Sequence, residues 1–396
     1  MRRWIALLLL VGAAAACREG SEGGARLTVG TYWGSAASEA LHRELILVTR
    51  DMGNVTVEVR PFTSTALSDF LLRGQARGGQ EALDLAVVPH DWLARLEQRE
   101  LIEEVPTETV QELRQKLVAQ ALLAGSEGEH VLAFPIGAEV LALVYDPSIF
   151  PTPPDTIEEI LSAPSPGGAL PFAFDASRPS HLAPFVSSLQ GTLVDAKGYL
   201  VWRGDAVSEV LARLRPAWER SGGWRSCRGA DVESLQIQLY AEGKLSSFLA
   251  GPWLVHALEQ IGRPFAVVPI PRLAGAPHPA RALVGYDCVV ALRGSRWTDL
   301  ALDIGNRLLM EGPNERLSRA TGRLPVLIGA YESSQGMKTS AGVGFLRALE
   351  AGQFIPSTMH WGEGFSRAEA QLLLLSGPPQ PPTAQDIRSL LIGGRS

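Results

Sequence analysis

Tryptophans and carboxylates dominate the residues of this chain that have the chemistry to bind a small molecule. Trp33, Trp92, Trp253 and Trp361 all fall in predicted loops. A tryptophan ring in a cleft can stack on a sugar ring while neighbouring polar groups hydrogen-bond the hydroxyls. The same ring can instead pack as a lid over the core, and the sequence leaves both interpretations open.

Catalytic chemistry has no matching pattern in the sequence. It lacks a phosphate-binding glycine loop, a Gly-x-Ser-x-Gly turn and a His-Glu-x-x-His zinc helix. The seven histidines are scattered without metal-ligand spacing, so we expect no metal and no cofactor. A glycosidase needs two carboxyl groups flanking the bond, and Asp91, Glu139, Asp175 and Asp287 qualify only as carboxylates of the kind that any cleft contains.

Length and composition indicate an ordinary globular protein. The chain has 396 residues, of which 46% are hydrophobic and 20% charged. At about 150 residues per domain, this length favours two or three domains or two large lobes, with a core that needs no disulfide. The formal net charge is −6 and no basic run occurs, which argues against a nucleic-acid partner.

The N-terminus has the pattern of a bacterial lipoprotein signal. Arg2 and Arg3 precede a short apolar run, three small residues and then Cys17. The run is shorter than the roughly 20 helical residues that span a bilayer. We expect removal of residues 1–16, a lipid on Cys17 and a flexible tether over residues 17–26. The protein would then be exported and anchored in the cell envelope, whereas the alternative is an ordinary signal with a chance cysteine.

Two further cysteines, Cys227 and Cys288, follow much later in the chain. In an oxidising compartment they can pair. Their separation in the sequence says nothing about their distance in space, so two buried thiols remain an equal alternative.

Strand and helix patterns alternate along the first part of the chain. We predict strands at residues 27–32, 55–59 and 83–88, with helices over 37–48 and around 67–71. Such alternation predicts a parallel sheet covered by helices, which binds ligands at the carboxyl ends of its strands. Those ends are followed by Trp33 and by residues 89–92.

The remainder of the chain continues the α/β pattern. Strand-like runs occur at 132–136, 140–145, 265–269 and 289–292, and helical periodicity at 206–218. Thr156 is a plausible N-cap for a helix over 156–161, with Glu159 at the capping-box position. A last helix is expected after the proline-rich turn at 378–382.

Several motifs occur in the order found in one known family. Pro-Ile-x-x-Glu-x-x-x-x-x-Tyr spans residues 135–145, and Pro-x-Pro-Pro-x-Thr-x-Glu-Glu-Ile spans 151–160. Gly-Pro-Trp at 251–253 and Gly-Arg-Leu-Pro-Val at 322–326 follow. In these motifs, and over essentially the whole mature chain, the sequence resembles the family 1 extracellular solute-binding proteins of ATP-driven importers, the family of maltose-binding protein.

The resemblance implies an α/β fold of two lobes, the type II periplasmic-binding-protein fold, in which crossing hinge segments join lobes that close on the ligand. The crossings are expected near residues 137–140, 285–289 and 331–337. The predicted N-terminal lobe is therefore 27–138 with 288–332, and the C-terminal lobe 139–287 with 333–396.

The resemblance also implies ligand-binding roles for particular residues. Asp91, Glu139 and Trp253 match ligand-binding positions of the family, and Phe365 replaces a stacking tyrosine. We add Asp287 as a ligand hydrogen-bonder because it is polar in an otherwise apolar crossing. The alternative for Asp287 is a structural aspartate at a turn.

Departures from the family pattern put maltose itself in doubt. Val88 and Gly364 stand where the family protein has tryptophans, and Trp92 stands in place of an arginine. Trp33, Trp92 and Trp361 are available to rebuild a sugar platform in other positions.

We therefore predict a monomeric, lipid-anchored, non-enzymatic binding protein that delivers a carbohydrate of the maltodextrin class to the permease subunits of an importer. Acidic pocket residues also suit a polyamine or another cationic solute. A secreted glycosidase and a receptor lipoprotein that serves a sensor kinase are the remaining alternatives.

Overall fold

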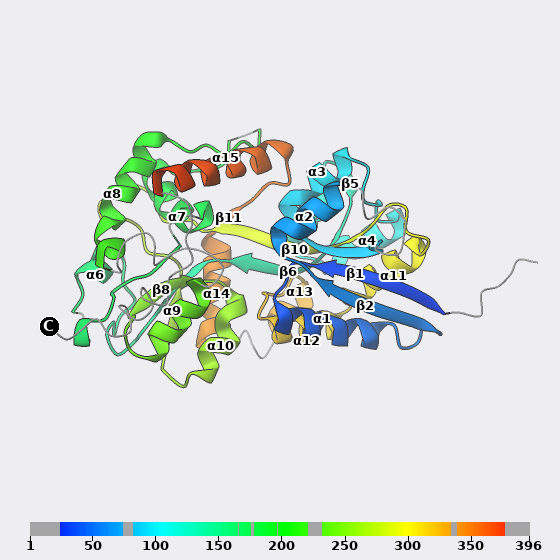
Figure 1. Cartoon of the computed structure of the whole chain (residues 1–396), viewed down its shortest axis with the longest axis horizontal. Coiled ribbons are helices and arrows are strands. Elements are labelled where there is room, and N and C mark those ends of the chain that lie inside the picture. Colours follow the sequence, from blue (N-terminus) through cyan, green and yellow to red (C-terminus); the bar gives the residue numbers. More distant parts are fainter. Residues whose placement is uncertain are drawn as a thin grey trace, which may run out of the picture.

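The computed structural model describes residues 24–73, 82–164, 166–175, 178–195, 197–220, 232–333 and 339–376. Two α/β lobes lie side by side along the long axis of the molecule (Figure 1). The right-hand lobe in this view contains the beginning of the described chain. The left-hand lobe contains the middle of the chain, in green, and the last described helix, in orange-red.

The first lobe is built on β1 (Ala25–Thr31), β2 (Val55–Pro61) and β3 (Leu85–Pro89). β1 pairs in parallel with both other strands, which confirms the parallel pairing expected from the sequence. The connecting helices are α1 (Ser35–Val48) and α2 (Ser64–Leu72). β1 begins inside the predicted tether because Ala25 and Arg26 pair with β2.

The first sheet is mixed rather than purely parallel. β10 (Leu283–Ala291) runs antiparallel to β3 and to β6 (Phe134–Val140), and parallel to β11 (Gln353–Phe354). The strand order is β11-β10-β3-β1-β2, with β6 also paired to β10. The antiparallel pairing arises because β10 comes back from the second lobe and runs against β3.

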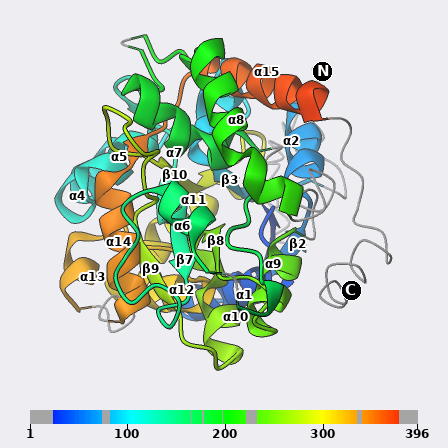
Figure 2. The same ribbon diagram turned by 90° about the vertical axis from the view of Figure 1, so that its left-hand side faces the viewer.

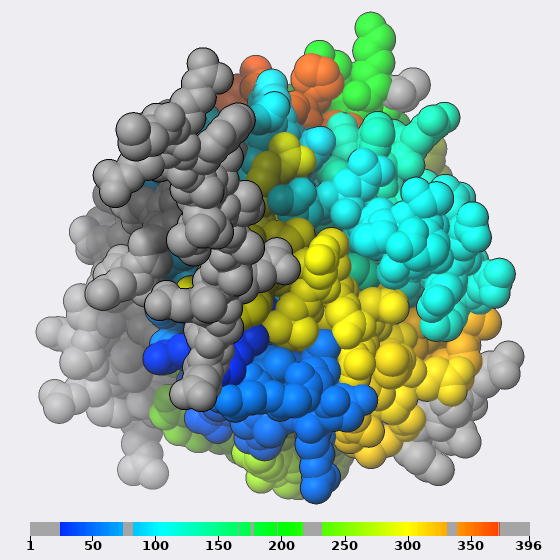
Figure 3. Space-filling view, turned by 90° about the vertical axis from the view of Figure 1, so that its right-hand side faces the viewer, coloured from blue at the N-terminus to red at the C-terminus, as the bar shows by residue number. Residues whose placement is uncertain are grey.

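Helices cover this sheet on both sides. Their bounds are α3 (Leu93–Gln98), α4 (Thr107–Lys116), α5 (Ala119–Ala124), α11 (Thr298–Leu308), α12 (Glu311–Thr321) and α13 (Ile328–Ser333). A small hairpin consists of β4 (Ser126–Glu127) and β5 (His130–Val131). The free end of the lobe exposes α1 in blue, α4 in cyan and α11 in yellow (Figure 3).

The second lobe contains a small antiparallel sheet. β7 (Ala142–Tyr145) lies between β8 (Ser247–Ala250) and β9 (Ala266–Val268). The helices around it are α6 (Ile157–Ser162), α7 (Pro179–Gln190), α8 (Gly204–Arg220), α9 (Val232–Ala241), α10 (Val255–Gln260), α14 (Ser340–Ala351) and α15 (Met359–Ser376). Figure 2 looks onto this lobe, with α8 and α9 beside the β7 sheet and α14 on its other side.

The start of α6 illustrates how local sequence sets an element boundary. The Thr156 side chain accepts a hydrogen bond from the backbone N–H of Glu159 at 3.3 Å, as the capping prediction requires. The Glu159 carboxylate reaches back to the backbone N–H of Asp155 at 3.1 Å. The first contact satisfies an N–H group of the first helical turn that has no partner within the helix, and the second ties that turn to the residue before the N-cap, so the helix begins at Ile157.

The chain passes between the lobes over a very short distance. β6 ends at Val140 and β7 begins at Ala142, so Leu141 alone separates a strand of the first sheet from a strand of the second. The predicted signal segment, Cys17, Cys227 and the predicted last helix lie outside the described residues. Within the described ranges, no helix combines the length and apolar character that crossing a bilayer requires.

Candidate functional site

Two loops meet at the carboxyl edge of the first sheet. Tyr32 and Trp33 follow β1, and η1 (His90–Trp92) follows β3. Because β1 and β3 are parallel neighbours, both loops leave the sheet at the same edge. The Tyr32 and Trp92 rings lie 6.4 Å apart between centroids, so the structure brings together segments that are nearly sixty residues apart.

A cavity of about 730 Å³ opens between this edge and α15. Asp91, Trp92 and Arg95 line it from the first lobe, and Phe365 and Glu363 line it from α15. Its walls thus combine two aromatic rings with charged groups. This combination suits a polar solute that also has apolar faces.

Behind Phe365, Trp361 is completely buried, and its ring lies 5.8 Å from the Phe365 ring. Trp33 is only 3% exposed. Both rings are therefore packed inside the protein in this conformation, whereas the side chains of Trp92, Trp253 and Phe365 are partly exposed.

His90 connects the two sides of the cavity. Its Nδ1 accepts a hydrogen bond from the backbone N–H of Tyr286 at 3.1 Å, and its Nε2 donates to the carbonyl of Ile355 at 2.7 Å. The Ser357 hydroxyl donates to the His90 carbonyl at 2.9 Å. Burial lowers the pKa of His90, which agrees with a neutral ring that accepts at one nitrogen and donates at the other.

Asp91 lies directly beside this histidine, facing the cavity. Burial raises the pKa of the Asp91 carboxyl, against the opposing charge of Arg95. Arg95 also lies over the Trp92 ring, with its guanidinium carbon 5.8 Å from the ring centroid. Arg95 thus places a cation against the Trp92 ring on one wall of the cavity.

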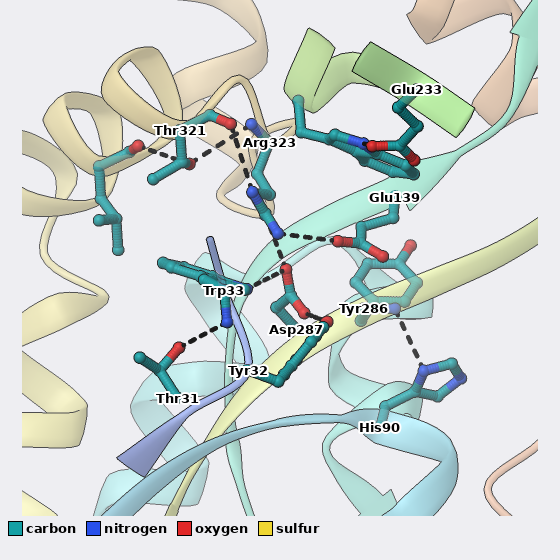
Figure 4. Close-up of polar contacts among 12 residues, drawn as sticks. Thr31, Tyr32, Trp33, His90, Glu139, Glu233, Tyr286, Asp287, Thr321 and Arg323 are labelled. Carbon is teal, nitrogen blue, oxygen red and sulfur yellow. Dashed lines mark hydrogen bonds and ion pairs between the residues drawn. The ribbon is translucent and has the colours of Figure 1, made fainter. Parts of the chain in front are cut away.

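A buried polar network surrounds Asp287 on β10 (Figure 4). It lies where β6 and β10 run between the lobes, and its residues are not among those that line the cavity. We call this network the floor of the cleft between the lobes. Asp287 is 0% exposed. It accepts hydrogen bonds from the Tyr32 hydroxyl, from Trp33 Nε1 at 3.1 Å and from Arg323 Nε at 2.8 Å. Three donors compensate the burial of this carboxylate.

Glu139, on β6, is the neighbouring carboxyl group. It accepts a hydrogen bond from Arg323 Nη2 at 3.2 Å, and its side chain is 25% exposed. Burial and the nearby Asp287 charge raise the pKa of Glu139 well above its usual value. Figure 4 shows Glu139 between Arg323 on one side and Glu233 on the other.

Trp253 approaches the floor from the second lobe, in the 3-10 turn η4 (Pro252–Leu254). Its Nε1 donates to Glu233 Oε2 at 3.3 Å. The ring folds back over Gly251, where a Cβ would lie 2.0 Å from the ring. Glycine at this position of the Gly-Pro-Trp motif is therefore required by the ring's placement.

The structure places Asp91, Trp92 and Phe365 on the cavity, and Glu139 and Asp287 in the separate network around Arg323, with Trp253 bonded to Glu233. Sequence reasoning missed Tyr32, Arg323, Glu233, Arg95 and His90. The available signal for Arg323 was a charged residue immediately before the apolar Leu-Pro-Val run. Within the described ranges, no group of three histidine, cysteine, aspartate or glutamate residues is arranged to hold a metal.

Two α/β lobes around a cleft, joined by strands that pass between them, define a solute-binding protein of the type II two-lobe fold. The chain belongs to the bacterial extracellular solute-binding protein family, whose sequence profile matches residues 49–342.

The chain is similar to binding proteins by sequence and by structure. The chain is 21% identical to maltotriose-binding protein of Pyrococcus abyssi (strain GE5 / Orsay) over 338 residues, which are 82% of this chain and 71% of that protein. Thermus thermophilus maltotriose binding protein bound with maltotriose superposes with a TM-score of 0.77 at 23% identity, covering 92% of this chain and 98% of that chain. The maltose/maltodextrin-binding domain MalE from Bdellovibrio bacteriovorus bound to maltotriose gives 0.77 at 16% identity, covering 93% and 98%.

Proposed function

We propose that this chain is a carbohydrate-binding protein that captures a maltodextrin-like oligosaccharide in the cleft and delivers it to the permease of an ATP-driven importer. The observation that carries the proposal is the cavity of about 730 Å³ walled by Trp92 on one side and Phe365 on the other. The names of the related binding proteins, which specify maltotriose, support the same ligand class.

The chemistry of the cleft suits a sugar. Partly exposed Trp92, Phe365 and Trp253 offer apolar faces to the C–H faces of pyranose rings. Asp91, Glu139 and Glu233 offer oxygens to hydroxyl groups, and such hydrogen bonds to charged groups are stronger than neutral ones. No covalent step is required for capture and release.

Ligand-driven closure of the two lobes would signal occupancy to the permease. Trp92 and Phe365 come from different sides of the cavity, so a ligand contacts both only when the sides are close. The lobes in this proposal are residues 27–138 with 288–332, and 139–287 with 333–396.

The N-terminal sequence supports attachment to a membrane through a lipid on Cys17. In a host that processes lipoproteins, Cys17→Ala should abolish incorporation of labelled fatty acid and release the protein from the membrane fraction. Unchanged labelling and fractionation would overturn the lipid anchor without affecting the ligand proposal.

Isothermal titration calorimetry of the protein lacking residues 1–17 tests the ligand. Maltotriose should bind, and spermidine and amino acids should not. A sugar at 100 times its Kd should stabilise the protein by about 2.7 kcal/mol in a parallel thermal unfolding experiment. Recovery of intact maltotriose after incubation would agree with binding alone, whereas liberated glucose would indicate a hydrolase.

A cationic solute is the second candidate. Glu139, Glu233 and Asp287 bring three carboxyl groups to the floor of the cleft, whereas Arg323 is the cation that contacts two of them. A polyamine would supply the missing positive charge. Binding of spermidine without binding of any oligosaccharide would replace the sugar proposal with this one.

A further inference from the structure

Arg323 is the most deeply buried arginine among the ion pairs of the described residues. Its side chain is 8% exposed, whereas the next most buried one, that of Arg263, is 19% exposed. Burying a guanidinium is costly unless its N–H groups find acceptors. Its neighbours should therefore explain why the charge is there.

The guanidinium contacts three side chains of the cleft floor. Nε donates to Asp287 on β10 at 2.8 Å, and Nη2 donates to Glu139 on β6 at 3.2 Å. The face of the group lies over the Trp33 ring, with its central carbon 4.3 Å from the ring centroid. The planar guanidinium thus links β6 and β10, the two strands that extend between the lobes, to the loop after β1 (Figure 4).

The third nitrogen of the guanidinium, Nη1, binds the segment that immediately precedes Arg323 in the sequence. Nη1 donates to the carbonyl of Thr321 at 3.4 Å. Thr321 ends α12, and its hydroxyl donates back to Leu317 at 2.8 Å. The position of the guanidinium is therefore fixed by the end of a helix rather than by a flexible side chain alone.

The charges of the floor require this cation. Asp287 has three donors, whereas Arg323 is the donor that contacts Glu139. Without the guanidinium, two neighbouring carboxyl groups would face each other in a partly desolvated place. They would repel each other when both are ionised and would take up a proton or move apart.

We propose that Arg323 is a positioning residue for the ligand: its guanidinium, held by the buried Trp33–Asp287 pair, fixes the partly exposed Glu139 carboxyl where the bound solute meets it. The inference rests on the proposed function for the identity of the solute. It adds a residue that contacts the ligand-binding groups from behind and sets their charge.

The test compares Arg323→Met with Arg316→Met. Arg316 lies on α12, the helix that precedes Arg323, and forms a two-pronged ion pair with Glu44, at 3.0 and 2.6 Å, and Glu44 is itself 4% exposed. Both substitutions remove an arginine from a buried carboxylate, but Glu44 belongs to α1 and lies outside the cleft network. A general loss of stability should therefore affect both variants, and a positioning role should affect Arg323→Met alone.

Maltotriose titrations from pH 5 to pH 8 give the distinctive readout. Arg323→Met should weaken binding by about tenfold or more at pH 8 and by about threefold or less at pH 5, because a protonated Glu139 carboxyl needs no counter-charge. Arg323→Lys should restore much of the pH profile but not the full affinity, because an ammonium keeps the charge and loses the planar geometry. Arg316→Met should bind like the parent protein.

A ligand-free measurement separates this inference from the proposed function. Unfolding of Arg323→Met should show a loss of stability, relative to the parent, that grows as pH rises from 5 to 8. Equal stability losses at both pH values, or unchanged maltotriose affinity in a folded Arg323→Met protein, would overturn the positioning role. A parent protein that binds no sugar would overturn the sugar assignment, and the pH profile of unfolding would still decide the role of Arg323.

Discussion

At the scale of single residues, two neighbouring carboxyl groups of the cleft floor differ in their donors. Asp287 accepts from a phenol, an indole and a guanidinium. Glu139 accepts from the guanidinium, and burial together with the Asp287 charge raises its pKa. A carboxyl group with few donors holds its proton more tightly in a low-dielectric place. Glu139 is therefore the group of this pair whose protonation should affect stability.

Glu139→Gln should make the protein relatively more stable at higher pH. The pKa of Glu139 is raised in the folded state, so its contribution is fully present below the unfolded value of about 4.3 and is lost as pH rises through the folded value. The neutral amide avoids that loss. The difference in unfolding free energy between variant and parent, from urea denaturation, should favour the variant more at pH 8 than at pH 5. Glu112→Gln, at an exposed pair with Lys116, should show no such trend.

Trp92→Ala should weaken maltotriose binding by about 1–3 kcal/mol if its ring covers a sugar face, the range expected for burying a large apolar side chain. Trp297→Ala is the matched control, because Trp297 packs beside Arg296 at the start of α11, away from the cavity. Calorimetric titration measures both. Equal affinities of Trp92→Ala and the parent would remove Trp92 from the ligand site.

At the scale of elements, neutral histidine rings form hydrogen bonds that connect helices and turns to neighbouring segments of the chain. His90 links η1 to β10 and to the segment before α15. His181, in the first turn of α7, accepts a hydrogen bond from the backbone N–H of Asp175 at 3.1 Å through Nδ1. An imidazolium has no lone pair at Nδ1, so protonation breaks the hydrogen bonds that these two histidines accept from Tyr286 and Asp175, whereas His90 Nε2 can still donate to Ile355.

Acid should therefore destabilise the second lobe through His181. Burial lowers the pKa of His181 to about 3, below the unfolded value of about 6.5. The unfolded chain takes up a proton first as pH falls, so stability declines from about pH 6.5 down towards the folded value. His181→Asn keeps an acceptor that does not titrate. Urea unfolding at pH 7 and pH 5 should show a smaller acid loss for the variant, and an equal loss would contradict this role.

At the scale of the whole molecule, the lobes touch at one edge beside Trp253. The backbone at Gly322, which follows α12, lies so close to η4 that a Cβ there would be 2.4 Å from the Pro252 carbonyl oxygen. His256 Nε2, on α10, donates to the carbonyl of Arg319 at 2.5 Å. This edge therefore couples the segment that carries Trp253 to the helix that precedes Arg323.

Gly322→Ala should push the lobes apart at this edge. Gly322 has φ +73°. Its control, Gly275, has a similar φ of +71°, but nothing lies within 4 Å of a Cβ added there. Both substitutions should lower the free energy of unfolding by about 1–2 kcal/mol, because each places a residue with a side chain in the left-handed conformation. Small-angle scattering should show a larger radius of gyration, and calorimetry a weaker maltotriose affinity, for Gly322→Ala alone. Identical behaviour of the two variants would argue against a contact between lobes that matters for binding.

The fold could be predicted further from sequence than the site. Periodicity located β1, α1, β2 and α6 because apolar spacing and capping residues act locally. The antiparallel pairing of β10 depends on a return from the second lobe, which no local pattern encodes. Likewise, Tyr32 and Arg323 are joined only through Asp287, which is 255 residues from one and 36 from the other. Residue type singled out Asp287 itself, because it is polar in an apolar strand.

The strand order has a consequence for how the chain is made. β1 lies near the start of the described chain, whereas β10 and β11 complete the same sheet only at residues 283–291 and 353–354. A ribosome must therefore synthesise more than 350 residues before the first sheet has all its strands. Such long sequence separation between pairing partners slows folding. A nascent chain would thus stay incompletely folded, and open to chaperones, for nearly the whole of its synthesis.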